Sequence, residues 1–283
     1  LARARALAQR TGLRRLSFAG GVAQNCVAIG RIRRETPFGE VFVPPGAGDS
    51  GGATGAAALA YRELSGRRPA PLVDARLGPS FDSAGIGQIL ASAGIDALDF
   101  RGREALLVED VARRLASGSI VGWFQGPMEF GARALGAGSI LADPRDEGML
   151  EKLNARVKKR EAFRPFAPSV LLSHAGALLD LDHPSPFMLE TCAVRSTVPL
   201  PAITHVDGSA RPQTVDPKSN PRFAALLEAF RARTGVALLV NTSMNVRGEP
   251  IVCTPTDALT DLVEANLDAL ALEDFLVRRE AVP

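Results

Sequence analysis

We predict a mixed α/β (α+β) fold in two domains, and three observations lead to it. The chain has 283 residues, more than the roughly 150 of a typical domain. A succession of strand, glycine-rich turn and helix occurs twice near its beginning. Residues 65–80 are rich in proline, arginine and glycine, as linkers between domains often are. We therefore expect a first domain at 1–68, a connecting segment at 69–103 and a second domain at 104–283.

Hydrophobic spacing and turn residues predict the individual elements. In the first domain, strands are expected at 16–21 and 40–43 and helices at 22–35 and 53–64. Farther along, helices are expected at 83–93, 104–116, 146–157, 221–233 and 255–265. The remaining strands are expected at 97–100, 119–125, 139–142, 169–172, 188–195, 237–241 and 269–271. Such alternation is typical of a sheet with helices packed on it.

Composition excludes several classes of protein. Hydrophobic residues make up 46% of the chain and charged residues 23%, which rules out extensive disorder. The net charge of +2 gives no global field that would favour nucleic acid or a membrane as partner. No apolar run approaches the roughly 20 residues of a membrane-spanning helix. Three widely spaced cysteines fit a reducing compartment, so we expect a cytoplasmic protein.

Glycine-rich turns in the first domain are candidate ligand sites. Gly20, Gly21 and Asn25 lie where a strand passes into a helix, and backbone N–H groups there favour an anion. A tight turn needed only for packing would look the same. In the next turn, Gly48 lets the backbone approach a ligand, and Asp49 could bind a metal or cap the following helix. Both alternatives stay open for each turn.

The second domain carries cationic candidates. Arg133 follows a strand in a glycine-rich turn, where it could pair with Glu129 or hold a phosphate. Residues 156–164 contain five cations in nine positions. Charge runs are usually solvated faces, but Phe163 and Phe166 are interleaved with this one. That pattern favours an ordered anion site.

Two further polar stretches follow. His205 and Arg211 lie in a polar turn, where an isolated histidine is more often structural than catalytic. Residues 241–250 follow the apolar strand at 236–240 and place amides, hydroxyls and an arginine at the edge where α/β sheets bind ligands. The three histidines are scattered and no HxxxH or HExxH motif occurs, so a complete metal site cannot be assembled from this chain.

Seven ordered motifs extend over nearly the whole chain. They are GGVAQN at 20–25, the glycine-rich run at 45–57, MEFGARALG at 128–136, SILADPR at 139–145, the cationic run at 154–171, AITHVDGSARPQTV at 202–215 and NTSMNVRGEPIVCTPTDA at 241–258. With these motifs the chain resembles the O-carbamoyltransferases of antibiotic and nodulation-factor biosynthesis. It begins at Leu1 and looks like their C-terminal portion, without the N-terminal half that carries an HxxxH motif.

The resemblance implies part of an actin/sugar-kinase-like domain followed by a threonylcarbamoyl-adenylate-synthase-like domain. In the first, Gly20, Gly21, Asn25 and Gly48 would line a nucleotide and Asp49 would bind a metal. In the second, it implies the catalytic residues Arg133, Lys158, Arg160, Arg164, His205 and Arg211, and the nucleotide-binding residues Ser243, Asn245 and Arg247. The family usually has proline at the position of Ala132 and arginine at that of Gly138.

The implied activity is ATP-dependent carbamoyl transfer. Carbamoyl phosphate and ATP would form carbamoyl-adenylate, and the carbamoyl group would pass to a hydroxyl of a small-molecule acceptor, a natural product or sugar. ATP and a divalent metal of the iron or magnesium type would be the cofactors, and a homodimer is one expected assembly. The arginine-rich loops and the lack of a Ser/His/Asp triad agree with electrostatic rather than nucleophilic catalysis. The alternative is a truncated or degenerate nucleotide-binding homologue without full transfer activity. RNA binding at 156–164 is less favoured, because the run offers no platform of aromatic rings for base stacking.

Overall fold

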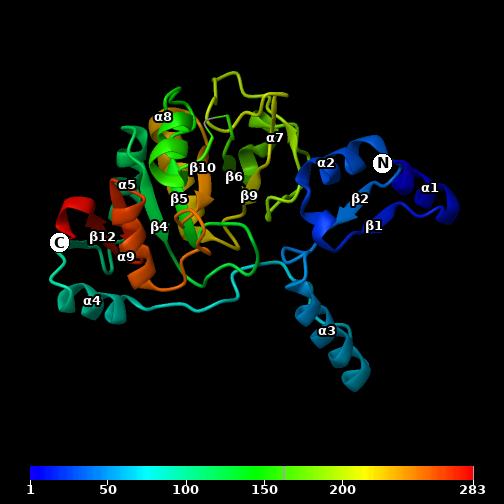
Figure 1. The fold of residues 1–283 in the computed structure, drawn as a ribbon, viewed down its shortest axis with the longest axis horizontal. Helices are drawn as coiled ribbons and strands as arrows, with labels where there is room; N and C mark the ends of the chain where they lie inside the picture. Colours follow the sequence, from blue (N-terminus) through cyan, green and yellow to red (C-terminus); the bar gives the residue numbers. More distant parts are fainter. Residues whose placement is uncertain (162, 283) are drawn as a thin grey trace.

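The computed structural model describes residues 1–161 and 163–282. It consists of a small N-terminal unit and a larger body built around one sheet, with the helix α3 projecting away from both (Figure 1). The expected mixed α/β class is confirmed. None of the helices in the described part of the chain is long and apolar enough to cross a membrane.

The small unit contains the two expected strand-turn-helix successions. Its elements are α1 (Ala2–Thr11), β1 (Arg15–Ser17), a 3₁₀ turn (Gly21–Gln24), α2 (Cys26–Glu35), β2 (Glu40–Phe42) and α3 (Gly51–Ser65). β1 and β2 pair in parallel, with Leu16 opposite Val41. The helix expected at 22–35 is divided, because Asn25 takes an extended conformation and its Oδ1 accepts a hydrogen bond from Ala28 N at 3.0 Å. α1 was not predicted from the sequence.

The large body is built on a mixed sheet of eight strands in the order β3-β12-β11-β4-β5-β10-β6-β9. Their bounds are β3 (Ala97–Asp99), β4 (Val121–Phe124), β5 (Gly138–Ala142), β6 (Ala167–Leu171), β9 (Gln213–Val215), β10 (Leu238–Ser243), β11 (Ala269–Leu272) and β12 (Phe275–Arg278). The central strand β10 runs antiparallel to both β5 and β6. β3 lies in the segment expected to connect the domains, yet it pairs with β12 at the edge of this sheet.

Helices cover both faces of the sheet. On one face, α5 (Glu104–Ala116) packs against α8 (Pro221–Thr234) over a core that includes Leu107, Trp123 and Phe230. On the other, α4 (Ser83–Ser92) and α9 (Pro255–Glu264) bury apolar residues against the sheet, together with the short α6 (Met149–Lys152). α5 has the predicted bounds, because its apolar residues repeat at helical spacing.

Three segments differ from the expectation. The strand expected at 188–195 is reduced to β7 (Cys192–Ala193), which pairs with β8 (Ser209–Ala210), because Met188 takes a left-handed conformation with φ of 54°. The helix expected at 146–157 becomes α6 and a π-helical segment (Leu153–Lys158), ended by Lys159 at φ of 46°. α7 (Ala175–Leu178), β8, β9 and β12 were not predicted.

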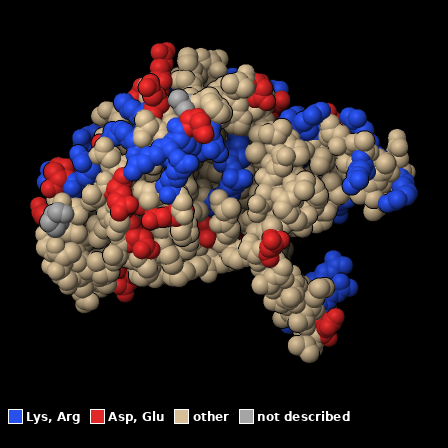
Figure 2. All heavy atoms as spheres, viewed as in Figure 1, with Lys and Arg blue, Asp and Glu red and all other residues tan. Residues whose placement is uncertain are grey.

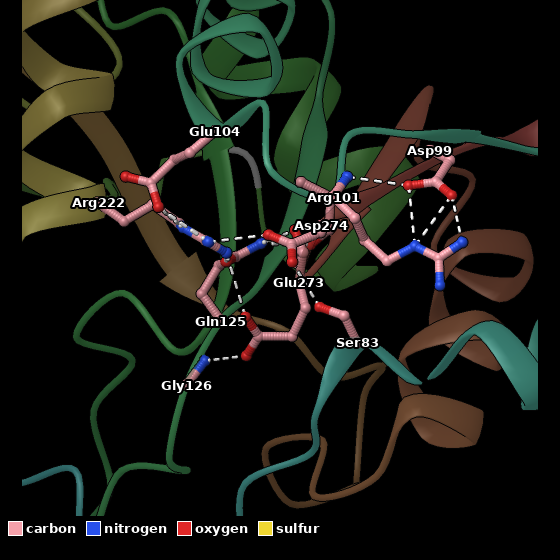
Figure 3. Close-up of polar contacts among 10 residues, drawn as sticks. Ser83, Asp99, Arg101, Glu104, Gln125, Gly126, Arg222, Glu273 and Asp274 are labelled. Carbon is pink, nitrogen blue, oxygen red and sulfur yellow. Dashed lines mark hydrogen bonds and ion pairs between the residues drawn. The ribbon is translucent and has the colours of Figure 1, made fainter. Parts of the chain in front are cut away.

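An ion-pair cluster around Arg222 joins separate elements of the large body (Figure 3). At the start of α8, its guanidinium contacts Glu104 at 2.9 Å, Glu273 at 3.2 Å and Asp274 at 2.9 Å. It also donates to Gln125 Oε1 at 2.7 Å. The cluster therefore fixes the start of α5, the end of β4 and the turn between β11 and β12 against α8.

Candidate active site: a cation-lined cavity

A cavity of about 340 Å³ lies where β10 ends. Four segments meet there: the loop after β4, the end of the π-helical segment with the residues that follow it, the region before β9, and the end of β10. Lys and Arg side chains gather around a hollow on the face of the large body shown in Figure 2. The predicted site residues that line the cavity are Arg133, Lys158, Arg160, Arg164, Arg211, Ser243, Asn245 and Arg247.

Lys158 binds the chain that leaves β10. Its Nζ donates to Ser243 O at 2.6 Å and to Asn245 Oδ1 at 2.7 Å. Burial lowers the pKa of Lys158 to about 8, and the charge of Arg160 lowers it further, while Asp261 acts in the opposite direction. A lysine of this kind holds the Ser243–Asn245 turn in place and adds a positive charge that titrates near neutral pH.

Arg160 is held by neutral partners. Its Nε donates to Asn154 Oδ1 at 2.7 Å, and its guanidinium lies over the ring of Phe166, 4.7 Å from the centroid. Burial lowers the pKa of Arg160, as does the charge of Arg164 to a lesser degree. Arg164 itself is exposed and lies 3.7 Å from Glu161. The Phe166 ring thus positions Arg160 and leaves its charge without a counterion.

Arg133 and Arg211 are the most deeply placed arginines of the cavity. Burial lowers the pKa of each, and the charge of Arg133 lowers the pKa of Arg211 further. Arg133 reaches the small unit, where its Nη2 lies 3.5 Å from Gln24 O. Within the described residues, neither arginine forms an ion pair with a carboxylate. Two desolvated guanidiniums without counterions favour an anionic ligand.

The loop that carries Arg133 is closed by Glu129, which is 4% exposed. Glu129 Oε1 accepts hydrogen bonds from Leu135 N at 2.7 Å and Ala137 N at 2.8 Å, and Oε2 accepts one from Gly138 N at 3.1 Å. The alternative of a Glu129–Arg133 ion pair is therefore wrong. A side chain at position 138 would meet Ile251 rather than line the cavity, so the glycine there removes no cation from it.

The predicted site residues of the small unit lie outside the cavity lining. Gly20 has φ of 98°, which a glycine adopts readily, and its N donates to Ala47 O. Asn25 caps α2, and Gly48 lies so close to Gln24 that a Cβ would be 2.9 Å from Gln24 Nε2. The adjacent Gly21 begins the 3₁₀ turn. Close packing of two turns thus accounts for these glycines, and a nucleotide there remains a prediction.

Asp49 is exposed, and the idea that it caps the following helix is wrong. α3 begins at Gly51 after Ser50, and no side chain accepts a capping hydrogen bond there. Within the described part of the chain, no group of three or more His, Cys, Asp or Glu side chains could hold a metal ion. The residues present therefore do not make a complete metal site around Asp49.

His205 is a structural neighbour of the cavity. Its Nδ1 lies 3.0 Å from Ser209 Oγ, and its backbone N donates to Ser209 O at 2.8 Å. Burial lowers the pKa of His205, which favours the neutral imidazole. It does not appear in the cavity lining, in contrast to Arg211 six residues later.

Sequence reasoning left four residues around the cavity without a role. Asn241, Thr242 and Phe166 line it, and Gln213 lies behind it at 5% exposure. Asn241 could have been found from its position at the end of an apolar strand. Gln213 gives no such signal, because a single glutamine near a polar turn has no characteristic pattern.

The fold and the cavity define a mixed α/β protein with an anion-binding site at the end of its central strand. Two family models match the chain, "Carbamoyltransferase N-terminus" over residues 2–58 and "Carbamoyltransferase C-terminus" over residues 112–279. The chain therefore belongs to the carbamoyltransferase family, and the resemblance seen in its motifs is confirmed.

Named relatives agree with this assignment. Nodulation protein NolO of Bradyrhizobium diazoefficiens is 43% identical over 277 residues, which cover 95% of this chain and 50% of NolO. The 3'-hydroxymethylcephem-O-carbamoyltransferase of Amycolatopsis lactamdurans is 36% identical, covering 88% of this chain and 45% of that protein. The chain thus spans about half the length of the relatives it matches.

A solved structure is also similar in part. The crystal structure of full-length HypF in the phosphate- and nucleotide-bound form matches 60% of this chain and 25% of its own, with a TM-score of 0.45 and 20% identity. The family assignment depends on the sequence matches, and the mixed α/β class depends on the sheet itself.

Proposed function

We propose that the cation-lined cavity binds carbamoyl phosphate and ATP and forms carbamoyl-adenylate, for ATP-dependent transfer of the carbamoyl group to a hydroxyl of a small molecule. One observation carries this proposal. Arg133, Lys158, Arg160 and Arg211 line one cavity, and within the described residues none of them is paired with a carboxylate. Membership of the carbamoyltransferase family supplies the class of group transferred.

The reaction brings many negative charges together. Carbamoyl phosphate loses its phosphate to water, an oxygen of the resulting carbamate bonds to the α-phosphorus of ATP, and pyrophosphate leaves. No protein nucleophile is needed, so the protein contributes by orienting the reactants and stabilising the charge that develops on the phosphoryl oxygens. Guanidiniums fixed before the ligand arrives do this without reorganising during the reaction.

The cavity residues divide this work. Arg133 and Arg211 neutralise phosphoryl charge at the deep end, where burial strengthens their interaction with an anion. Arg160, stacked on Phe166, adds a rigid fork of donors. Lys158 orients Ser243 and Asn245, whose side chains then face the ligand. Because Asp49 has no partner ligands among the described residues, none of these steps involves a metal.

The test is release of pyrophosphate from ATP by the purified chain, measured with and without carbamoyl phosphate. Release that depends on carbamoyl phosphate is expected, and Arg160→Ala should slow it at least about tenfold, as loss of one electrostatic contact usually does. Arg113→Ala removes an exposed arginine that pairs with Asp110 on α5 and serves as the control. A folded chain that binds ATP without releasing pyrophosphate would instead support a nucleotide-binding homologue without transfer activity.

A further inference from the structure

Asn241 is a buried amide at the wall of the cavity. It is 1% exposed, lies on the last part of β10 and belongs to the cavity lining. Its Nδ2 donates to Ser169 Oγ at 2.8 Å and lies 3.2 Å from Ala134 O and 3.2 Å from Gln213 Oε1. Its Oδ1 is buried and has no hydrogen-bond partner within the described residues.

The hydrogen-bond network fixes which way this amide faces. Ala134 O is a carbonyl and can only accept. Gln213 donates through Nε2 to Leu135 O at 2.8 Å, so its Oε1 is the atom turned toward Asn241. The Asn241 side chain must therefore present Nδ2 to these acceptors, which leaves Oδ1 on the opposite side of the amide.

An acceptor without a donor is unusual inside a protein and is costly to bury. It is more unusual beside this cavity, whose arginine and lysine side chains are donors only. These cations match the phosphate part of an acyl phosphate. A free carbonyl oxygen matches a ligand N–H group, which a carbamoyl group has and an acetyl group lacks.

We infer that Asn241 determines specificity for a carbamoyl group by accepting a hydrogen bond from its NH₂ through Oδ1. This inference rests on the proposed function, since it assigns the carbamoyl end of the same ligand. Asn241 then separates carbamoyl phosphate from other acyl phosphates, while the arginines bind the phosphate that all of them share. Ser169 and Gln213 keep the amide in the required orientation.

The experiment compares two neutral-ended phosphonates of equal charge. Phosphonoacetamide ends in an amide, and acetonylphosphonate has a methyl group in place of the NH₂. Calorimetric titration of the full chain should give a Kd for phosphonoacetamide at least about tenfold lower, the effect of one hydrogen bond at a site that requires it. Equal Kd values for the wild-type chain would overturn the inference, even if every variant failed to fold.

Two variants separate recognition from positioning. Asn241→Leu should abolish the preference and leave acetonylphosphonate binding within about threefold, because the cations remain. Ser169→Ala is the control, since it removes a partner of Nδ2 and keeps Oδ1, so the preference should persist. A preference that survives Asn241→Leu contradicts the inference. Loss of pyrophosphate release with an intact preference would instead contradict the proposed reaction.

Discussion

The ammonium group of Lys158 donates a hydrogen bond to Asn245 Oδ1 at 2.7 Å, within a cavity whose other charged residues are mostly arginines. Burial and the neighbouring Arg160 make this lysine the one cation of the cavity with a pKa of about 8. Its charge is therefore present below pH 8 and lost as the pH rises above it, whereas arginine stays charged throughout this range.

Anion affinity should follow the charge of Lys158. We expect the Kd for sulfate, which stays a dianion at these pH values, to be constant below about pH 7.5 and to rise by up to about tenfold per pH unit above pH 8. Calorimetry between pH 6.5 and 9.5 measures this. Lys158→Met should bind sulfate more weakly and with little pH dependence, and an unchanged pH profile in that variant would assign the titration to another group.

Removal of Glu129 should destabilise the loop that carries Arg133. Glu129→Leu leaves three buried backbone N–H groups without their acceptor, at Leu135, Ala137 and Gly138. We expect a loss of about 3 kcal/mol in the free energy of unfolding and weaker sulfate binding. Chemical denaturation gives the first quantity. Glu147→Ala, at an exposed position, should change stability by less than about 0.5 kcal/mol.

Arg222 should matter for stability rather than for binding. Arg222→Met leaves Glu104, Glu273 and Asp274 close together without their shared cation (Figure 3). Because these groups are partly exposed, we expect a loss of about 1–3 kcal/mol in unfolding free energy. Arg231→Met on the same helix breaks an exposed pair with Glu228 and should cost less than about 0.5 kcal/mol. Equal effects of the two changes would show that the cluster has no special weight.

The sequence predicts those parts of the fold that depend on local patterns. The bounds of α5 follow from apolar residues at helical spacing, and β4, β5 and β10 follow from apolar runs bounded by turn residues. The strand expected at 188–195 fails because Met188 turns the chain, which no local propensity requires. β12 was missed because it follows β11 after a short turn at Glu273, another residue with positive φ.

The candidate site divides in the same way. Composition singles out the segments that hold Arg133, Lys158 and Arg211, since glycine-rich turns and charge runs are visible in a sequence. That they meet in one cavity depends on β10 lying between β5 and β6, which is a long-range relationship. The free acceptor of Asn241 depends on the orientation of Gln213 and on the carbonyl of Ala134, so only tertiary structure can show it.

A histidine should couple pH to the contact between the small unit and the large body. Arg33 of α2 contacts Glu190 at 2.8 Å, and His183 Nε2 lies 2.8 Å from the same carboxylate. The hydrogen bond to Glu190, followed by that to Asp182, raises the pKa of His183, with burial acting in the opposite direction. A raised pKa means that protonated His183 stabilises the fold fully below about pH 6.5 and that this contribution is lost as the pH rises through its folded pKa.

We expect the wild-type chain to exceed His183→Gln in unfolding free energy by less than about 1 kcal/mol at pH 5.5, because the site is half-buried, and by less again at pH 8.5. Thermal denaturation of both proteins at the two pH values measures the difference. His174→Gln, which changes a histidine that contacts Ser173 instead of a carboxylate, is the control and should show no such trend. A stability difference that grows with pH would mean that His183 acts in its neutral form.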